Sequence, residues 1–199
     1  FGASLDKIKQ VVDVRDGEIM FGLNMVVHKG KTIFVGDTSV HEYPTSEQMA
    51  EIAISTARVV RLFGFDPKVA FVSHSTFGQP LTSRTKHIRN AVDILKEKKV
   101  DFEFDGDMQP DVALNSEYEE LYPFSKIVGK ANILIMPGQH SAAISYKMMK
   151  TLGDTKVIGP LLIGLGLPIE IAPLRSSTSE LINLASIAAY SADVIDYKK

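Results

Sequence analysis

The sequence contains no cysteine among its 199 residues. This absence excludes disulfide bonds, thiolate metal sites and a cysteine nucleophile, and it agrees with a cytoplasmic location. An excess of charge of either sign is also lacking, because 22 basic residues stand against 24 acidic ones and give a formal net charge of -2. With no basic block, the chain is not expected to bind nucleic acid or an anionic membrane surface.

A long uninterrupted apolar helix is missing as well. The longest apolar region, residues 158–174, contains three prolines and Glu170, so it cannot form a continuous membrane-spanning helix. The opening segment, FGASLDKIKQ, lacks the charged-then-apolar pattern of a signal peptide. It starts with Phe1 rather than methionine, and we expect a domain cut from a longer protein.

Apolar residues make up 45% of the chain, which is ample for a packed core. Apolar segments rich in branched residues alternate with amphipathic helical segments, a pattern typical of an α/β fold with a mostly parallel sheet. The short link Lys29-Gly30-Lys31 between segments 21–28 and 32–37 indicates an antiparallel hairpin, so the sheet is predicted to be mixed. Further strands are expected at 69–73, 102–104, 133–136 and 169–172.

Helix-start signals are clear at two places. Thr45 and Gln48 have capping-box spacing ahead of an apolar stripe that ends at Gly64, and Ser177 and Glu180 repeat this spacing at the start of the last helix. Other helices are predicted at 83–98, 110–121 and 141–152, and the last is predicted at 178–192. The best internal boundary is at residues 43–44, so we expect one lobe to contain 1–44 with 174–199 and a second lobe to contain 45–173.

Four polar clusters directly follow predicted strands. In open α/β sheets, ligands bind beyond the carboxyl ends of the strands, so we expect these clusters to converge on one cleft. Taken singly, each is better explained as a turn or a helix cap than as a site, because Ser, Asp and Gly are favoured there for local reasons. The clusters are residues 73–76 with Gly78, 105–107, 138–141 and 175–179.

The first three clusters do not define a reaction. Asp105 and Asp107 supply too few oxygen ligands to specify a metal site, so no metal is predicted and turn roles are favoured. His74 and His140 could act as general bases, but no spacing ties either to a nucleophile and an orienting acid. The segment from Gly164 to Gly166 lacks the third glycine of a dinucleotide-binding turn, which excludes a Rossmann site there.

The fourth cluster suits an anionic group such as a phosphate. It offers the Arg175 guanidinium, four hydroxyl groups and the free N–H groups of a helix N-terminus. Glu180 is open to two interpretations, a base in a cleft or the partner of Ser177 in a capping box, and we favour the capping role.

Several longer stretches carry a family resemblance. They cover most of residues 36–190 and are GDTSVHEYPTSEQMAEIA from Gly36, FDGDMQPDVAL from Phe104, GKANILIMPGQHSAAISYKMMKTLG from Gly129, IGPLLIGLGLP from Ile158 and ELINLASIAA from Glu180. Jointly they resemble the phosphate acetyl/butyryltransferase family, and most closely the phosphotransacetylase-like C-terminal domain of bacterial hybrid NADP-dependent malic enzymes. The resemblance implies a two-lobed α/β/α sandwich of the isocitrate/isopropylmalate dehydrogenase type, with the first lobe incomplete at its N-terminus and dimerisation through the second.

The resemblance also implies a loss of chemistry. Phosphotransacetylases move an acetyl group between coenzyme A and phosphate with a serine-arginine pair and, seven residues after the serine, an aspartate. Read without gaps, these positions are Pro173, Leu174 and Glu180 here. Proline and leucine cannot stabilise a developing oxyanion, and the extra methylene of Glu180 displaces its oxygen by about 1 Å, which costs on the order of 100-fold in a positioned reaction.

By resemblance, then, the chain is a regulatory and oligomerisation domain that binds acetyl-CoA, forms a homodimer or larger homo-oligomer, and is itself inactive. A malic-enzyme part of the same protein, N-terminal to this chain, would oxidise and decarboxylate malate to pyruvate with NADP and a divalent metal. Two alternatives stay open: an active acyltransferase in which Arg175 and Glu180 have taken over the lost roles, and a purely structural dimer module. The implied phosphate contacts are Arg175, Ser176 and Ser177, and the implied pantetheine contacts are Tyr146, Ile163 and Leu165.

Overall fold

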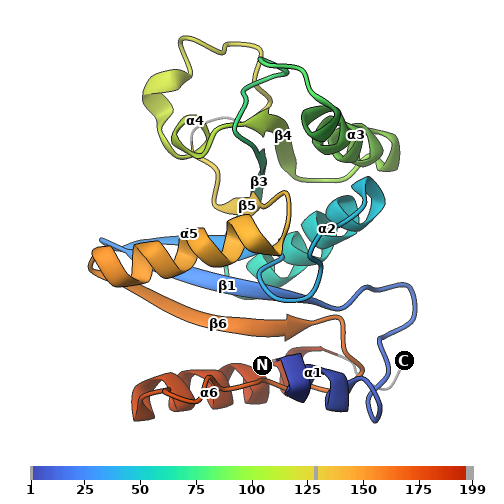
Figure 1. Ribbon diagram of the computed structural model, residues 1–199, viewed down its shortest axis with the longest axis vertical. Helices are drawn as coiled ribbons and strands as arrows, with labels where there is room; N and C mark the ends of the chain where they lie inside the picture. The colour runs from blue at the N-terminus through green and yellow to red at the C-terminus, as the bar shows by residue number, and fades with distance from the viewer. Residues whose placement is uncertain (1, 128–129, 196–199) are drawn as a thin grey trace.

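The protein is described by a computed structural model that covers residues 2–127 and 130–195. It has an α/β fold built on one mixed sheet of six strands in the order β4-β3-β5-β2-β1-β6, with helices on both faces (Figure 1). In chain order the elements are α1 (Gly2–Ile8), β1 (Phe21–His28), β2 (Lys31–Gly36), α2 (Ser46–Leu62), β3 (Lys68–Val72), α3 (Ser83–Lys98), β4 (Glu103–Met108), α4 (Pro110–Leu114), a 3-10 turn (Ser116–Tyr118), β5 (Ile133–Ile135), α5 (Gln139–Leu152), β6 (Thr155–Ile163) and α6 (Thr178–Val194).

The predicted hairpin is confirmed. β1 and β2 pair antiparallel with His28 opposite Lys31, and the two residues between them, Lys29 and Gly30, both have positive φ. Two positive φ angles in a two-residue loop match the right-handed twist of the paired strands. β2, β5, β3 and β4 then pair in parallel, so the mixed sheet is also confirmed.

Successive residues of the central strands enter different cores, as a pleated strand requires. Phe34, Phe71 and Ile133 pack with α2 and α3 on one face, and Val35 and Leu134 belong to the core that α4 and α5 cover on the other. A third, smaller cluster joins α1 to the end of β6 through Leu5, Met20, Leu162, Leu165 and Ile171. Among the described residues, no helix combines the length and apolar character needed to span a membrane.

The α2 signals are confirmed in detail. Gln48 N–H donates to Thr45 Oγ1 at 3.2 Å, and Thr45 N–H donates to Gln48 Oε1 at 2.8 Å. Met49, Ile52 and Ala53 on the predicted stripe are fully buried. Gly64, just past the helix end, has a φ of +81°, which fits glycine's role after a helix.

Two predicted elements are wrong. Residues 169–172 form no strand; the sixth strand is β6, Thr155–Ile163, which pairs antiparallel with β1. The sequence pattern did not predict this strand because it contains Pro160, which lacks a backbone N–H. β6 is the last strand of the sheet, where a missing N–H on the open side is tolerated. The predicted helix 110–121 ends at Leu114 because Asn115 Oδ1 accepts from Glu117 N–H at 3.2 Å and starts a separate 3-10 turn.

The predicted lobe boundary at residues 43–44 does not coincide with a break in the sheet. β1 and β2, before this boundary, lie between β5 and β6, which come after it. Residues 1 and 196–199 of the predicted first lobe, and part of the stretch that starts at Gly129, lie outside the described residues. The division into lobes therefore stays a prediction, without a structural boundary at this point of the described sheet.

Candidate ligand site along β6 and α6

The two carboxylates of the second cluster, Asp105 and Asp107, lie near the end of β4 and hold neighbouring loops in place. Asp107 is fully buried, and its oxygens accept from Gly78 N–H at 3.0 Å and from the Ser75 hydroxyl. Asp105 accepts from the N–H groups of Gly106 at 2.9 Å and Lys126 at 2.7 Å. The bonds give both carboxylates a structural role, but the predicted turn placement is wrong because residues 105–107 belong to β4 and Asp105 and Gly106 pair with β3. No group of three or more metal-ligating side chains occurs within residues 2–127 and 130–195.

The cluster at 138–141 meets the loop that follows β2. Gln139 N–H donates to the His41 carbonyl at 3.1 Å, and His140 Nε2 lies 3.5 Å from Glu42 Oε1. The imidazole of His140 is 74% exposed, and His74 is exposed as well. Such exposure fits surface histidines better than general bases held in a cleft.

The fourth cluster, residues 175–179, lies at the opposite edge of the sheet, so the prediction that all four converge is wrong. β6 runs parallel to β2, because both are antiparallel to β1, and its carboxyl end shares the edge where β2, β3 and β5 end. After β6 the chain turns back before α6 begins. Glu180, in the first turn of α6, accepts from Lys150 Nζ at 2.8 Å, and Lys150 lies in the last turn of α5.

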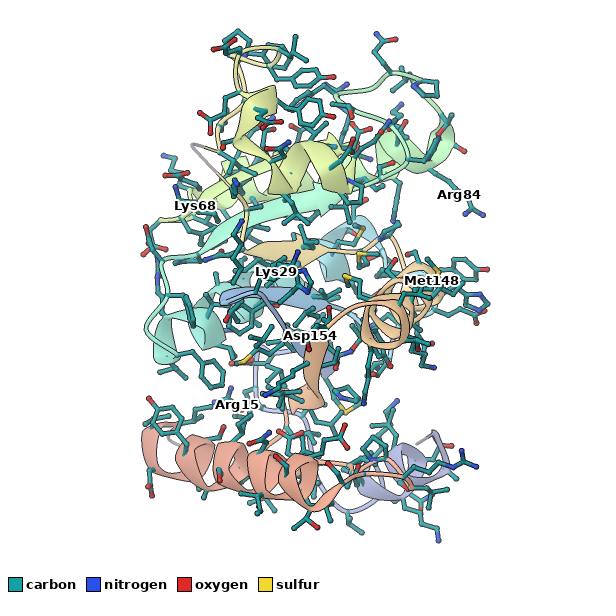
Figure 2. The ribbon with its side chains drawn as sticks, turned by 90° about the vertical axis from the view of Figure 1, so that its left-hand side faces the viewer. Arg15, Lys29, Lys68, Arg84, Met148 and Asp154 are labelled. Atoms are coloured by element: carbon teal, nitrogen blue, oxygen red, sulfur yellow. The ribbon has the colours of Figure 1, made fainter. Side chains whose placement is uncertain are left out.

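Two cavities lie along the seam between β6 and α6. The first, of about 210 Å³, is next to the start of α6, and we call it the lysine cavity; its wall includes Tyr146, Lys147, Lys150, Ser176, Glu180 and Asn183. The second, of about 370 Å³, lies next to the end of α6, and we call it the Glu170 cavity; its wall includes Arg15, Arg58, Ile163, Leu165, Glu170, Ile187 and Tyr190. Arg15 lies between the sheet and α6 (Figure 2).

The predicted binding residues are thus divided between two places. Tyr146 and Ser176 share the lysine cavity with Glu180, whereas Ile163 and Leu165 line the Glu170 cavity. The side chains of Arg175 and Ser177 are exposed on the turn itself. One ligand could contact the whole set only if it extended along α6.

Glu180 is held in a capping box, as the sequence favours. Its Oε2 accepts from Ser177 N–H at 2.8 Å and from the Ser177 hydroxyl at 3.0 Å, and its N–H donates back to Ser177 Oγ at 3.3 Å. The Lys150 ammonium and the Ser177 donors lower the pKa of the Glu180 carboxyl to about 2. So acidic a group is a poor proton acceptor near neutral pH.

The Ser176 hydroxyl is in the opposite situation. Its oxygen is buried in the wall of the lysine cavity without a hydrogen-bond partner in the described structure. A buried hydroxyl without a partner costs free energy. A polar ligand atom in the cavity would remove this cost.

The Glu170 cavity has mostly apolar walls. Glu170 Oε2 accepts from Leu162 N–H at 3.0 Å, and burial raises the pKa of the Glu170 carboxyl to about 8. The other acid of the wall, Glu18, pairs with Arg15 at 3.0 Å and with Arg58 at 2.9 Å. Glu170 is therefore mainly uncharged at neutral pH, while Glu18 has two cationic partners.

Lys150 and Glu170 are the main site residues that the sequence interpretation missed. Lys150 reads as part of the solvated face of its helix, and its partner is 30 positions further along the chain. Glu170 had a usable signal, because it is the only charged residue within the apolar region 158–172. A single carboxyl in such a region is either exposed at a bend or buried, and a buried carboxyl is a candidate for a functional site.

Removing the cap should weaken α6 modestly. Ser177→Ala is expected to lower the free energy of unfolding by about 1 kcal/mol at pH 7, because the hydroxyl's contacts with the Glu180 N–H group and the Glu180 carboxylate are lost. Because the folded-state pKa of Glu180 is depressed, its contribution is complete above pH 4.5 and fades as the pH falls toward 2. Urea unfolding at pH 7 and pH 3 checks this. Ser179→Ala, on the same turn, is the control, and an equal loss in both variants would contradict the capping role.

The fold and the site together define a class of protein. This class has an α/β fold with an elongated candidate ligand site between its last strand and its last helix. The family model for phosphate acetyl/butaryl transferase matches residues 2–189, and the chain belongs to this family. It is 44% identical over 192 residues to an NADP-dependent malic enzyme of Rhizobium meliloti, covering 96% of this chain and 25% of that protein. It is 32% identical over 185 residues to a phosphate acetyltransferase of Bacillus subtilis, covering 92% of this chain and 57% of that protein.

A solved structure gives the same result. A phosphotransacetylase from Streptococcus pyogenes superposes with a TM-score of 0.89 at 29% sequence identity, over 96% of this chain and 59% of that one. The chain spans about a quarter of the length of the malic enzymes that it matches. The predicted resemblance to this family and to malic enzymes is therefore confirmed.

Proposed function

We propose that this chain is a regulatory and oligomerisation domain that binds acetyl-CoA and does not transfer its acyl group. The proposal rests mainly on Glu180, whose carboxylate accepts hydrogen bonds from Ser177 and Lys150. It stands at the position of the family's aspartate, while Pro173 and Leu174 stand at the serine and arginine positions. A retained family fold with all three reactive positions changed favours binding without turnover.

The attached part would be a malic enzyme that decarboxylates malate with NADP and a divalent metal. The identity to malic enzymes, together with the quarter of their length that is matched, supports this placement. Acetyl-CoA binding to this domain would then shift the conformation of the catalytic part of the same protein, in the cytoplasm. For the complete domain we infer the two-lobed arrangement of the isocitrate/isopropylmalate dehydrogenase type.

An apolar stripe on α5 supports oligomerisation through the second lobe. Ile144, Met148 and Leu152 are four residues apart on one helix face and are 59%, 55% and 83% exposed. Met148 points outward from the helix (Figure 2). Large apolar side chains gathered on one exposed face are typical of surfaces covered by a partner, and a second copy of the chain is the partner that we propose.

Binding and turnover can be separated by two measurements. We expect calorimetry to detect acetyl-CoA binding at millimolar ligand or below, and we expect no acetyl phosphate formation from acetyl-CoA and phosphate above background. Arg175 with Ser176 and Ser177 would contact the phosphates, so Arg175→Ala should weaken binding. The exposed Arg84, on α3, gives the control variant Arg84→Ala.

Two results would overturn the proposal in favour of the alternatives. Turnover that is abolished by Glu180→Ala would show an active acyltransferase in which Glu180 is the base. An absence of binding at millimolar acetyl-CoA would leave a structural module.

A further inference from the structure

The lysine cavity has two lysine side chains in its wall, and the wall of the Glu170 cavity is mostly apolar. The pair therefore suits a long ligand with one polar end and one apolar end. α6 passes over both cavities, with Asn183 in the wall of the lysine cavity and Ile187 in the wall of the Glu170 cavity. The helix from Glu180 to Val194 measures about 20 Å at 1.5 Å per residue. Near its start, Lys147 and Lys150 provide two cationic groups against the single carboxylate of Glu180, which pairs with Lys150. The wall near its end is mainly apolar. An anionic head therefore fits the first cavity and an apolar tail fits the second.

Glu170 is a buried carboxyl group in the mostly apolar wall of the Glu170 cavity. It comes from the irregular segment between β6 and α6 and enters a wall that also contains Ile163, Leu165 and Pro168. Leu162 N–H, at 3.0 Å, donates to only one of its carboxyl oxygens, Oε2. The other oxygen, Oε1, accepts no hydrogen bond from residues 2–127 and 130–195. In the neutral acid, Oε2 is the oxygen that accepts from the Leu162 N–H group, so the proton lies on Oε1. This proton can be donated to a ligand.

The charged neighbours do not convert Glu170 into an ion pair. The cationic groups of the wall are already engaged: Arg15 and Arg58 contact Glu18, and Arg61 contacts Asp101 at 3.1 Å. Tyr190, from α6, donates its hydroxyl hydrogen to the Leu62 carbonyl at 2.9 Å. Burial consequently dominates the ionisation of Glu170 and raises its pKa to about 8. Glu170 is therefore a neutral hydrogen-bond donor in a cavity whose wall is mostly apolar.

From this arrangement we infer that Glu170 is a specificity-determining residue, which donates a hydrogen bond from its neutral carboxyl to the carbonyl oxygen of an acyl thioester whose tail occupies the Glu170 cavity. The inference rests on the proposed binding of acetyl-CoA and adds the part of the ligand that is recognised. An apolar wall accepts an uncharged acyl group and disfavours a free carboxylate. The volume of about 370 Å³ exceeds what an acetyl group fills, so longer acyl chains are admitted as well.

The test is calorimetry of acetyl-CoA binding at pH 7 and pH 9 with the wild type and with Glu170→Gln. Wild-type affinity should fall about tenfold over this range, because a carboxyl with a pKa of about 8 loses its proton between the two values. Glutamine keeps a donor of similar shape that does not ionise, so the variant should bind equally well at both pH values. S-ethyl-CoA keeps the chain length but lacks the carbonyl oxygen, and its affinity should not change with pH or with the substitution.

A matched variant and the remaining outcomes complete the test. Glu119→Gln replaces an exposed acid in another part of the fold and should keep the wild-type pH dependence. The same fall in affinity for wild type and Glu170→Gln would overturn the role of Glu170 and leave acetyl-CoA binding intact. No binding by the wild type at either pH would instead overturn the proposed function, so the two failures are distinguishable.

Discussion

Asp37→Ala is expected to lower the free energy of unfolding by about 3–5 kcal/mol, because a buried hub of hydrogen bonds would lose its only acceptor. Asp37 is 2% exposed and directly follows β2. Its carboxylate accepts from His41 Nδ1 at 2.7 Å and from four backbone N–H groups, those of Gly22, Ser39, Val40 and His41, at 2.7–3.1 Å. Alanine would leave these donors buried without a partner. Urea unfolding followed by circular dichroism at pH 7 measures the loss.

A surface aspartate provides the control for this prediction. Asp93 lies 2.6 Å from Lys96 but is 61% exposed, and exposed ion pairs contribute less than about 1 kcal/mol. Asp93→Ala should therefore have little effect, and similar losses in the two variants would contradict the role assigned to Asp37. The loop that Asp37 holds contacts the start of α5 through the His41 carbonyl. Since α5 carries Tyr146 and Lys150, Asp37→Ala should also weaken the proposed binding of acetyl-CoA.

Local signals were sufficient to predict much of the fold. The hairpin follows from Lys29 and Gly30, and the starts of α2 and α6 follow from capping boxes whose two members are three residues apart. These features depend on neighbouring residues alone, so the sequence contains all the information they need. β6 was not predicted because it contains Pro160, and proline is disfavoured in the interior strands of a sheet. An edge strand tolerates it, but the sequence does not reveal which strand lies at the edge.

The site was less predictable because its contacts join distant parts of the chain. The choice between a capping role and a basic role for Glu180 could be made locally, but its second partner, Lys150, depends on how α5 and α6 pack. The environment of Glu170 depends likewise on α2, α6 and the segment before β1, which together close the cavity around it. Burial of this kind sets the ionisation of a carboxyl. Spacing along the chain therefore did not identify Glu170.

Gly164→Ala is expected to lower the free energy of unfolding by about 2–4 kcal/mol. Gly164 directly follows β6 and has a φ of +88°, which costs a residue with a side chain about 1 kcal/mol. A Cβ at this position would also collide with the backbone carbonyl of Ile19 and lie 3.2 Å from Met20 Cα. Backbone atoms cannot move away as a flexible side chain can, so the overpacking adds about 1–3 kcal/mol.

Gly17→Ala separates the steric collision from the backbone conformation. Gly17 has a φ of +73°, but no atom lies within 4 Å of the added Cβ, so its replacement should cost only about 1 kcal/mol. Equal losses in the two variants, measured by urea unfolding, would show that the close approach to Ile19 is unimportant. Gly164 also lines the Glu170 cavity, where its carbonyl accepts from Arg15 N–H at 2.9 Å. The collision should shift Ile163 and Leu165, so Gly164→Ala is expected to weaken the proposed binding of acetyl-CoA, whereas Gly17→Ala should preserve it.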